Sequence, residues 1–255
     1  MLNILVANDD GIQAAGIRHL VDALAEVANV YVCAPDSQRS AAGHGMSMNK
    51  PIYVEEVEYK NACKAYAVSG TPADCVKLGV HLLEKEAIKI DMVYSGINMG
   101  GNLGTDAIYS GTVAAAMEGC LYGIPSVAVS VDNHEATHFE RACELAVAVC
   151  RNVFDKMDGD MILNINTPDL PKEEIKELKY TRMGRREYKE FYEVKTDEAG
   201  NLQYWYGGDR IIYEGLPDDI DVIAHQNGHA TITPMQYDLT AYNYVDKIKN
   251  WGIEK

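Results

Sequence analysis

The sequence is short of positive charge and of long apolar runs. Its 255 residues include 23 Lys and Arg against 38 Asp and Glu, which gives a net charge of −15. A nucleic-acid duplex or an anionic membrane is bound through a basic face, so neither is an expected partner. No stretch approaches the roughly 18 apolar residues of a membrane span. A small phosphorylated ligand is still compatible with this charge, because a bound cation can reverse the local field.

Cysteine pairs of the CxxC type are also missing. The six cysteines lie mostly within apolar segments, which favours buried, reduced thiols in a cytoplasmic protein. No basic segment precedes the first apolar run, and that run ends after a few residues at Asp9 and Asp10. A secretory signal is therefore not expected.

The first two thirds of the chain alternate short apolar strands with amphipathic helices. This alternation predicts an α/β fold with a doubly wound, mostly parallel sheet, Rossmann-like and three-layered. Strands are expected at 3–8, 29–35, 52–57, 64–68, 91–96, 125–131 and 161–166, and helices at 15–27, 72–84, about 113–121 and 137–155.

The pattern changes after Thr167 and Pro168. Residues 178–235 are rich in tyrosine and charge and carry several turn signals, which is typical of short strands rather than βαβ units. A strand at 230–234 and a closing helix at 240–250 are expected. We therefore divide the chain into an α/β catalytic domain, 1–168, and a β-rich extension, 169–255, that serves in oligomerisation.

Polar side chains follow three of the predicted strands. In doubly wound folds, ligands bind beyond the carboxyl ends of the strands, so these side chains are expected to meet at one edge of the sheet. Oxygen ligands of this kind suit Mg²⁺ or Mn²⁺ rather than zinc. The set comprises Asn8, Asp9 and Asp10, then Asp36, Ser37, Arg39, Ser40 and His44, then Asn98, Asn102 and Asp106, and finally Ser110, Gly111 and Thr112.

The adjacent carboxylates of Asp9 and Asp10 are the strongest single feature. They repel each other at the end of a buried strand, and a divalent ion between them would turn that repulsion into attraction. In the alternative, one aspartate caps the next helix and the other faces water. Gly11 permits a tight turn, and several loops bring matching oxygen ligands, so we favour the metal.

The segment Ser110–Gly111–Thr112 lies at a predicted helix start. Free N–H groups and the helix dipole make such a position a good phosphate site, although ordinary capping by Ser110 or Thr112 is an equal alternative. The glycines of "GGNLG" at 100–104 do not match the dinucleotide-binding fingerprint in spacing or position. A nucleotide-cofactor enzyme is therefore disfavoured.

Several other polar residues have open roles. His44 could be a general acid or base, or a solvated loop residue, and Arg39 could clamp a phosphate or lie free on the surface. His19 and His81 lie on predicted helices and are expected to be structural. His225 and His229 lie in the extension and would reach the site only if that extension folds back.

The motifs "ILVANDDGIQAAGI", "APDSQRSAAGHG", "SGTPADCVKLG", "SGINMGGNLGTDAIYSGTVAAAMEG" and "ATITPMQYDLT" occur in this order. They resemble the SurE-like family of stationary-phase survival proteins, which are metal-dependent nucleoside-monophosphate phosphatases. The resemblance implies one divalent metal ion per subunit, and dimers or tetramers that exchange C-terminal elements. It assigns metal binding to Asp9, Asp10, Ser40 and Asn98, phosphate binding to Ser110, Gly111 and Thr112, and no role to His44.

The resulting hypothesis is metal-assisted hydrolysis of a nucleoside 5′- or 3′-monophosphate to nucleoside and phosphate. Asp9 and Asp10 are the expected catalytic residues, and Asn98 is expected to lie beside the bound phosphate. No covalent aspartyl-phosphate is expected, because Gly11 and Ile12 follow the aspartates where a DxDxT motif would be required. The rival hypotheses are a non-catalytic nucleotide or metal sensor and a nucleotide-cofactor enzyme that uses the same crevice.

Overall fold

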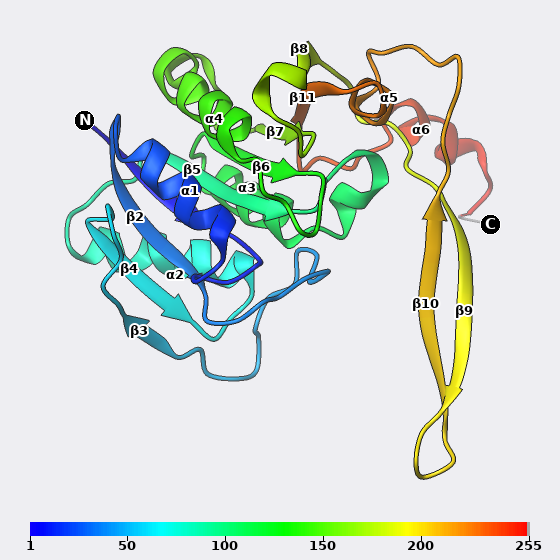
Figure 1. Ribbon diagram of the computed structural model, residues 1–255, viewed down its shortest axis with the longest axis horizontal. Coiled ribbons are helices and arrows are strands. Elements are labelled where there is room, and N and C mark those ends of the chain that lie inside the picture. The colour runs from blue at the N-terminus through cyan, green and yellow to red at the C-terminus, as the bar shows by residue number, and fades with distance from the viewer. Residues whose placement is uncertain (254–255) are drawn as a thin grey trace.

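A nine-stranded sheet forms the centre of the computed structural model, which describes residues 1–253 (Figure 1). Its strand order is β3-β4-β2-β1-β5-β6-β7-β11-β8. The six strands from β4 to β7 in this order are parallel to one another, whereas β3 and β11 pair antiparallel with their neighbours β4 and β7. The strands are β1 Leu2–Ala7, β2 Ala28–Pro35, β3 Val54–Glu56, β4 Lys64–Val68, β5 Met92–Met99, β6 Ser126–Val131, β7 Ile162–Thr167, β8 Lys176–Tyr180 and β11 His229–Met235.

Helices cover both faces of this sheet. In Figure 1, α1 and α4 lie on one face and α2 and α3 on the other, which confirms the three-layer, mostly parallel α/β fold. The helices of this part are α1 Ala15–Leu24, α2 Pro72–Lys85, α3 Gly111–Leu121 and α4 Glu140–Asn152, with short 3₁₀ turns η1 Gly104–Ile108, η2 Phe154–Lys156 and η3 Lys172–Glu174.

The buried faces follow from the sequence periodicity. On α1, Ile17, Leu20, Val21 and Leu24 are fully buried at helical spacing, and each such aliphatic side chain contributes about 1.5–3 kcal/mol of transfer free energy. β6 is buried along its whole length, as expected of a strand covered on both faces.

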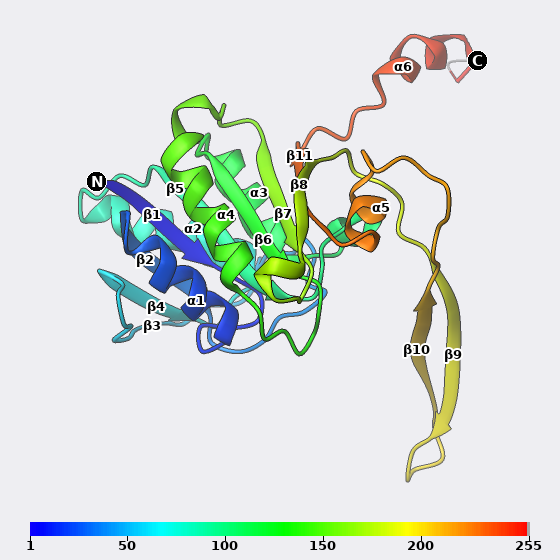
Figure 2. The same ribbon diagram turned by 45° about the horizontal axis from the view of Figure 1, so that its top comes forward.

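The C-terminal part contributes two strands to the same sheet and a hairpin that leaves it. β11 and β8 extend the sheet beyond β7, so the division at residue 168 does not separate two sheets. The hairpin of β9 Tyr188–Thr196 and β10 Leu202–Arg210 stands away from the body in two views (Figures 1 and 2). A short helix that the sequence pattern did not predict, α5 Asp221–Gln226, packs on β11, and the end of the described chain carries α6 Tyr242–Val245 and η4 Lys247–Asn250.

The six cysteines are all free thiols. Four of them, Cys33, Cys75, Cys120 and Cys150, are buried, as expected, whereas Cys63 is exposed. In the part of the chain that the structure describes, no helix has both the length and the apolar character needed to cross a bilayer.

Helix α2 begins with a capping box, and its loss gives the first prediction. The Thr71 hydroxyl accepts a hydrogen bond from the Asp74 N–H (3.1 Å), and the Asp74 carboxylate accepts one from the Thr71 N–H (2.9 Å). Thr71→Ala should lower the free energy of unfolding by about 1 kcal/mol, because it leaves a helix donor unpaired. Urea titration measures this loss, and Thr71→Ser, which keeps the hydroxyl, should retain most of the stability.

Candidate active site

The candidate site lies where the strand order reverses. β1 sits between β2 and β5, so the loop after β2 turns to one side of β1 and the loop after β5 to the other. A crevice at such a switch point is the usual ligand site of a doubly wound sheet. The loops after β1, β2 and β5 are those on which the sequence placed its oxygen ligands.

The turn after β1 is built by Asn8 and Gly11. The buried Asn8 amide donates to the Gly11 carbonyl (2.9 Å) and accepts from the Gly11 N–H (3.2 Å). Gly11 has φ of +100°, a conformation that favours glycine. This turn projects Asp9 and Asp10 from the end of the strand. The sequence pattern placed Asn8 at the site but predicted no role for it; the structure shows that it positions the turn carrying the two aspartates.

Asp9 is almost completely buried, with 5% of its surface exposed. Its carboxylate accepts a hydrogen bond from Thr112 Oγ1 (2.5 Å), and its carbonyl accepts one from the Arg39 N–H (2.7 Å). Burial raises the pKa of Asp9 from 3.8 to about 6; the hydrogen bond from Thr112 lowers it in part, and the neighbouring charge of Asp10 raises it further. The side chain is therefore held in place by a hydrogen bond that offsets the cost of burying its charge only in part.

Asp10 is half-buried and faces the end of β5. Its Oδ2 accepts a hydrogen bond from the Met99 N–H (3.0 Å), and its Oδ1 accepts one from Gln38 Nε2 (3.4 Å). Burial raises the pKa of Asp10, and the hydrogen bond from Met99 opposes this rise. Asp10 thus ties the loop after β2 to the end of β5.

The electrostatics of this pair fit a bound cation. No Lys, Arg or His of residues 1–253 forms an ion pair with either carboxylate. Within the same residues, no three His, Cys, Asp or Glu side chains lie together as a ready set of metal ligands. A cation here would therefore need two carboxylates and further neutral oxygens, a donor set that suits Mg²⁺ or Mn²⁺.

Asn98 and Ser40 are the neutral ligands that the sequence proposed. Asn98 lies at the end of β5, beside Met99, and its amide nitrogen donates to the Gly100 carbonyl (2.6 Å), which leaves its side-chain oxygen free to bind. Ser40 is exposed, and its hydroxyl makes no hydrogen bond to another described residue. The bond between Arg39 and Asp9 brings the Ser40 segment to the site, but whether Ser40 binds a metal stays a prediction.

Arg39 has a structural role that neither alternative anticipated. Its guanidinium donates to the Asp36 carboxylate (3.2 Å) and to the Ser69 carbonyl (3.1 Å). It therefore fastens the loop after β2 to the turn that precedes α2.

The helix start at Ser110–Gly111–Thr112 faces Asp9. Ser110 is the N-cap of α3, and its hydroxyl accepts from the Val113 N–H (3.1 Å), so the capping alternative holds for this residue. Gly111 packs so closely on Asp9 that an added Cβ would lie 2.8 Å from the Asp9 Cβ. The positive end of the α3 dipole is thus directed at the carboxylates, where it favours a further anion.

Two residues of the polar set expected at this edge of the sheet, Asn102 and Asp106, stabilise a loop. Asn102 is buried; its side chain donates to Ser130 Oγ (2.8 Å), and its backbone N–H donates to Asn166 Oδ1 (2.8 Å). Asp106 pairs with Arg186 (3.2 Å) and accepts a hydrogen bond from Tyr188. Both fix the glycine-rich loop between β5 and α3.

The sequence pattern missed an ion cluster around Asp132. This carboxylate follows β6 and pairs with Arg186 (3.0 Å), Arg210 (2.8 Å) and His225 (3.2 Å). Burial would raise the pKa of Asp132, but the hydrogen bond from His225 and the charge of Arg186 hold it well below its usual range. The cluster joins the base of the hairpin to the body. Its partners lie 54 to 93 positions away in the chain, so no local signal could have indicated it.

Fold and site together define the class: a doubly wound α/β protein with an acidic, oxygen-lined crevice at its switch point. The particular family follows from comparison with known proteins. The family model described as "Survival protein SurE" matches residues 4–190. The chain belongs to the SurE family, which confirms the resemblance seen in its motifs.

Relatives match over nearly the whole chain. The 5′-nucleotidase SurE of Heliobacterium modesticaldum is 41% identical over 252 residues, covering 98% of this chain and 92% of that protein. The 5′-nucleotidase SurE of Trichormus variabilis is 43% identical over 264 residues, covering 98% of each. The crystal structure of the SurE protein from Aquifex aeolicus has a TM-score of 0.84 at 39% identity and covers 97% of this chain and 98% of that one.

The raised pKa of Asp9 predicts how stability depends on pH in the presence of a chelator. Because the pKa is about 6 in the folded protein and 3.8 ordinarily, the folded state binds the proton more tightly than the unfolded chain. Stability should therefore fall as pH rises from about 4 to about 6, by on the order of 1–3 kcal/mol in total.

Asp9→Asn should remove this decline and raise the stability at pH 7.5 in EDTA, since a neutral amide can still accept from Thr112. Urea unfolding at pH 4.5 and 7.5 measures both effects. Equal pH dependence in the variant and the parent protein would show that Asp9 is not the group responsible.

Proposed function

We propose that this protein is a metal-dependent phosphomonoesterase that hydrolyses nucleoside 5′- or 3′-monophosphates to nucleoside and phosphate. The observation that carries the proposal is the placement of Asp9 and Asp10, two carboxylates without a cationic partner among the described residues, opposite the N-terminus of α3. Its membership of the SurE family, in which the relatives from Heliobacterium modesticaldum and Trichormus variabilis are named 5′-nucleotidases, supports the same activity.

One divalent ion per subunit, Mg²⁺ or Mn²⁺, would be held by Asp9, Asp10, Ser40 and Asn98. When bound, such an ion polarises a phosphoryl oxygen and lowers the pKa of a water molecule that it binds. The two carboxylates supply the negative charge that holds it, and the amide oxygen of Asn98 adds a neutral ligand at the end of β5.

The substrate phosphate would lie between this ion and the start of α3. Gly111 and Thr112 carry backbone N–H groups of the first helical turn, which lack intrahelical partners; that of Thr112 is also directed at the Asp9 carboxylate. Such donors stabilise charge on a transferring phosphoryl group. Asp9 or Asp10 would accept the proton of the attacking water, and each is held by a hydrogen bond that fixes its orientation.

The two rival functions have less support. A nucleotide-cofactor enzyme of this fold needs glycines in its first βα turn for the pyrophosphate, and here that turn carries Asp9 and Asp10 with the single Gly11. A non-catalytic sensor has no observation in its favour, whereas the two relatives described above carry the name of an enzyme.

Replacement of Asp10 tests the proposed activity. Asp10→Asn should lower the rate of p-nitrophenyl phosphate hydrolysis in Mn²⁺ by more than about a hundredfold, since loss of a direct ligand should exceed the 10–100-fold typical of outer residues. The parent activity should disappear in EDTA and return with added Mn²⁺. Circular dichroism checks that the variant is folded, and wild-type rates in Asp10→Asn would refute the site.

Substrate choice is tested separately with adenosine 5′- and 3′-monophosphate, by release of inorganic phosphate.

Thermal unfolding separates the proposed activity from its rivals. Mn²⁺ should raise the Tm, and NAD should leave it unchanged. The opposite pattern would favour the cofactor enzyme, and binding of nucleotide without turnover would favour the sensor.

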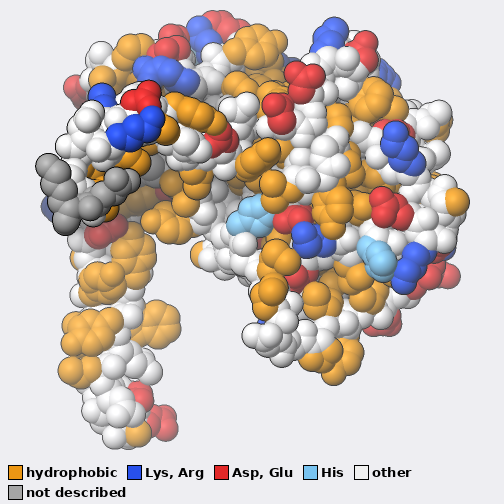
Figure 3. All heavy atoms as spheres, turned by 180° about the vertical axis from the view of Figure 1, so that it is seen from behind, with side chains coloured by type: hydrophobic (Ala, Val, Ile, Leu, Met, Phe, Trp, Pro, Cys, Tyr) orange, Lys and Arg blue, Asp and Glu red, His pale blue; other side chains and the backbone are white. Residues whose placement is uncertain are grey.

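We also infer a homodimer or homotetramer, assembled through the C-terminal extension. Tyr192 lies opposite Tyr206, and Val194 lies opposite Tyr204, so all four point to one face of the hairpin. Each is more than half exposed, and Figure 3 shows apolar side chains along the hairpin, clear of the body. An isolated two-stranded hairpin is marginally stable in water, so a partner surface over this face would stabilise it.

We further propose that the protein works in the cytoplasm. Its six free thiols are typical of a reducing compartment.

This assembly can be tested on the apolar face of the hairpin. Val194→Ser combined with Tyr204→Ser should shift the mass in solution from a multiple of the 28.1 kDa subunit to the subunit itself, because the lost apolar contact area is what holds the subunits together. Light scattering after size-exclusion chromatography measures the mass. The matched control is Glu193→Gln on the opposite face, which should leave the mass unchanged, and an unaltered oligomer in the double variant would exclude this face as the interface.

A further inference from the structure

Glu118 is a buried carboxylate outside the proposed metal site. It lies on α3, and only 2% of its side chain is exposed. Two donors compensate its charge: Lys77 Nζ on α2 (2.7 Å) and His44 Nε2 in the loop after β2 (2.9 Å). Burial would raise the pKa of Glu118, but these two hydrogen bonds lower it below its usual range. The carboxylate is therefore charged and can only accept, so His44 donates from Nε2.

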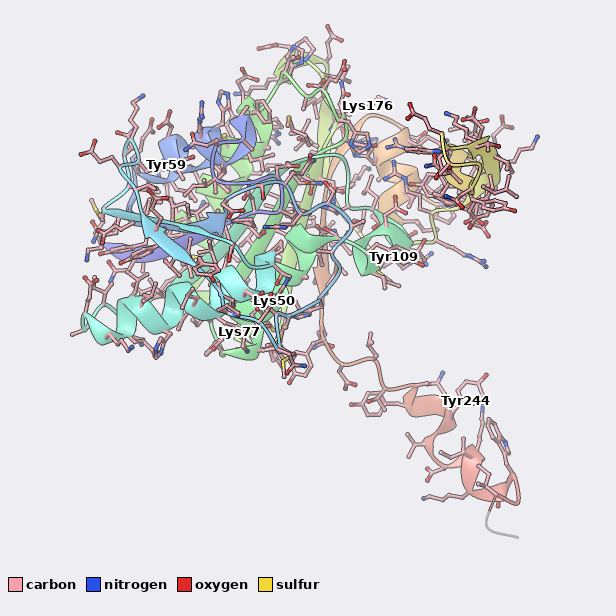
Figure 4. All side chains as sticks on the ribbon, turned by 90° about the horizontal axis from the view of Figure 1, so that it is seen from below. Lys50, Tyr59, Lys77, Tyr109, Lys176 and Tyr244 are labelled. Atoms are coloured by element: carbon pink, nitrogen blue, oxygen red, sulfur yellow. The ribbon has the colours of Figure 1, made fainter. Side chains whose placement is uncertain are left out.

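His44 is the middle attachment of residues 36–50, the loop that carries Ser40. The loop is fastened at its start by the bond from the Arg39 N–H to the Asp9 carbonyl (2.7 Å) and near its end by the Ser47 N–H on the Asp74 carboxylate (3.1 Å). Between these two points, the described residues make only two hydrogen bonds from the loop to the rest of the protein. The Gly43 N–H donates to the Tyr109 carbonyl (3.0 Å), and the His44 side chain donates to Glu118. In Figure 4, Lys77 and Tyr109 mark α2 and the segment beside η1, the two elements that flank this loop.

The backbone next to Ser40 needs this support. Ala41 has φ of 55°, in the left-handed region that residues with a Cβ rarely adopt. Such a conformation persists where surrounding contacts determine it, and it occurs often at functional sites. Side-chain contacts to the body lie on both sides of Ala41: Arg39, two residues before it, donates to the Ser69 carbonyl (3.1 Å), and His44, three residues after it, donates to Glu118 (2.9 Å).

Both ends of the contact between His44 and Glu118 bear on the proposed site. Glu118 lies six residues after Thr112 on the same helix, and Thr112 donates to Asp9. His44 lies four residues after Ser40. The contact therefore sets the distance between the segment carrying Ser40 and the helix that faces the phosphate.

We propose that His44 is a positioning residue, which, through its hydrogen bond to Glu118, holds the Ser40 segment against α3 so that Ser40 can complete the cation site. This inference rests on the proposed function. It assigns to His44 no contact with substrate and no proton transfer in the reaction.

The experiment measures Mn²⁺ binding directly, by titration calorimetry on the full chain, alongside p-nitrophenyl phosphate hydrolysis. His44→Leu removes the donor and should raise the Kd for Mn²⁺ about tenfold, the low end of the range for residues that orient metal ligands. The Mn²⁺ concentration that gives half-maximal rate should rise by the same factor. His44→Gln keeps a donor at similar reach and should restore both values.

The matched control is His81→Leu, which removes an exposed histidine from α2 and should leave both values unchanged. Because Glu118 loses one of its two donors, the Tm of His44→Leu in EDTA should be lower than that of the control, and His44→Gln should restore it. If His44→Leu does not fold, His44→Asn, whose amide is too short to reach Glu118, takes its place. Wild-type Mn²⁺ affinity in His44→Leu overturns the inference, as does a lower Tm in EDTA with no rescue by His44→Gln. If the unmodified protein neither binds Mn²⁺ nor releases phosphate, the proposed function itself fails.

Discussion

Two adjacent carboxylates at the end of a buried strand are the constraint around which the site is organised. Asp9 and Asp10 have raised pKa values because the fold withdraws them from water; neither forms an ion pair with a basic side chain of the described residues, and the charge of His134 lowers the pKa of Asp10 only in part. A chain gains nothing in stability from such a pair, since a buried charge without a partner is costly. A ligand of opposite charge would offset that cost, and this is the physical basis on which a metal site is proposed there.

The strand order explains why two neighbouring loops can serve that pair. β2 and β5 flank β1, so whatever follows them must pass beside Asp9 and Asp10. Three short bonds fix these segments to the aspartates: Arg39 in the loop after β2 donates to the Asp9 carbonyl, and at the two ends of the connection from β5 to α3, Met99 donates to the Asp10 carboxylate and Thr112 to the Asp9 carboxylate. Two of these three donors are backbone N–H groups, so the geometry depends on main-chain position more than on side-chain identity.

This dependence explains what could be predicted from the sequence. The apolar runs are a local pattern, and they predicted the α/β fold; the Asp9–Asp10 pair is another, and with the switch-point rule it places the proposed site at the end of β1. Contacts between distant segments carry no such pattern: Asp132 with Arg186, and Glu118 with His44, become visible only when the chain is folded. α5 was missed for a related reason, because its six residues are too few to establish a period and it is held by packing on β11. Asn102 was grouped with the polar side chains expected at this sheet edge, and the structure shows it holding the glycine-rich loop through Asn166 and Ser130.

The overall charge sharpens the argument for a cation. A phosphate monoester carries nearly two negative charges at neutral pH, since its second pKa is about 6, and this chain carries −15. Asp9 and Asp10 add local repulsion at the point where the phosphate must arrive, and the N-terminus of α3 supplies only about half a positive charge. The helix alone therefore cannot reverse the field of two carboxylates. A divalent ion held between them can do so, and it makes the same crevice attractive to a dianion only while the ion is bound.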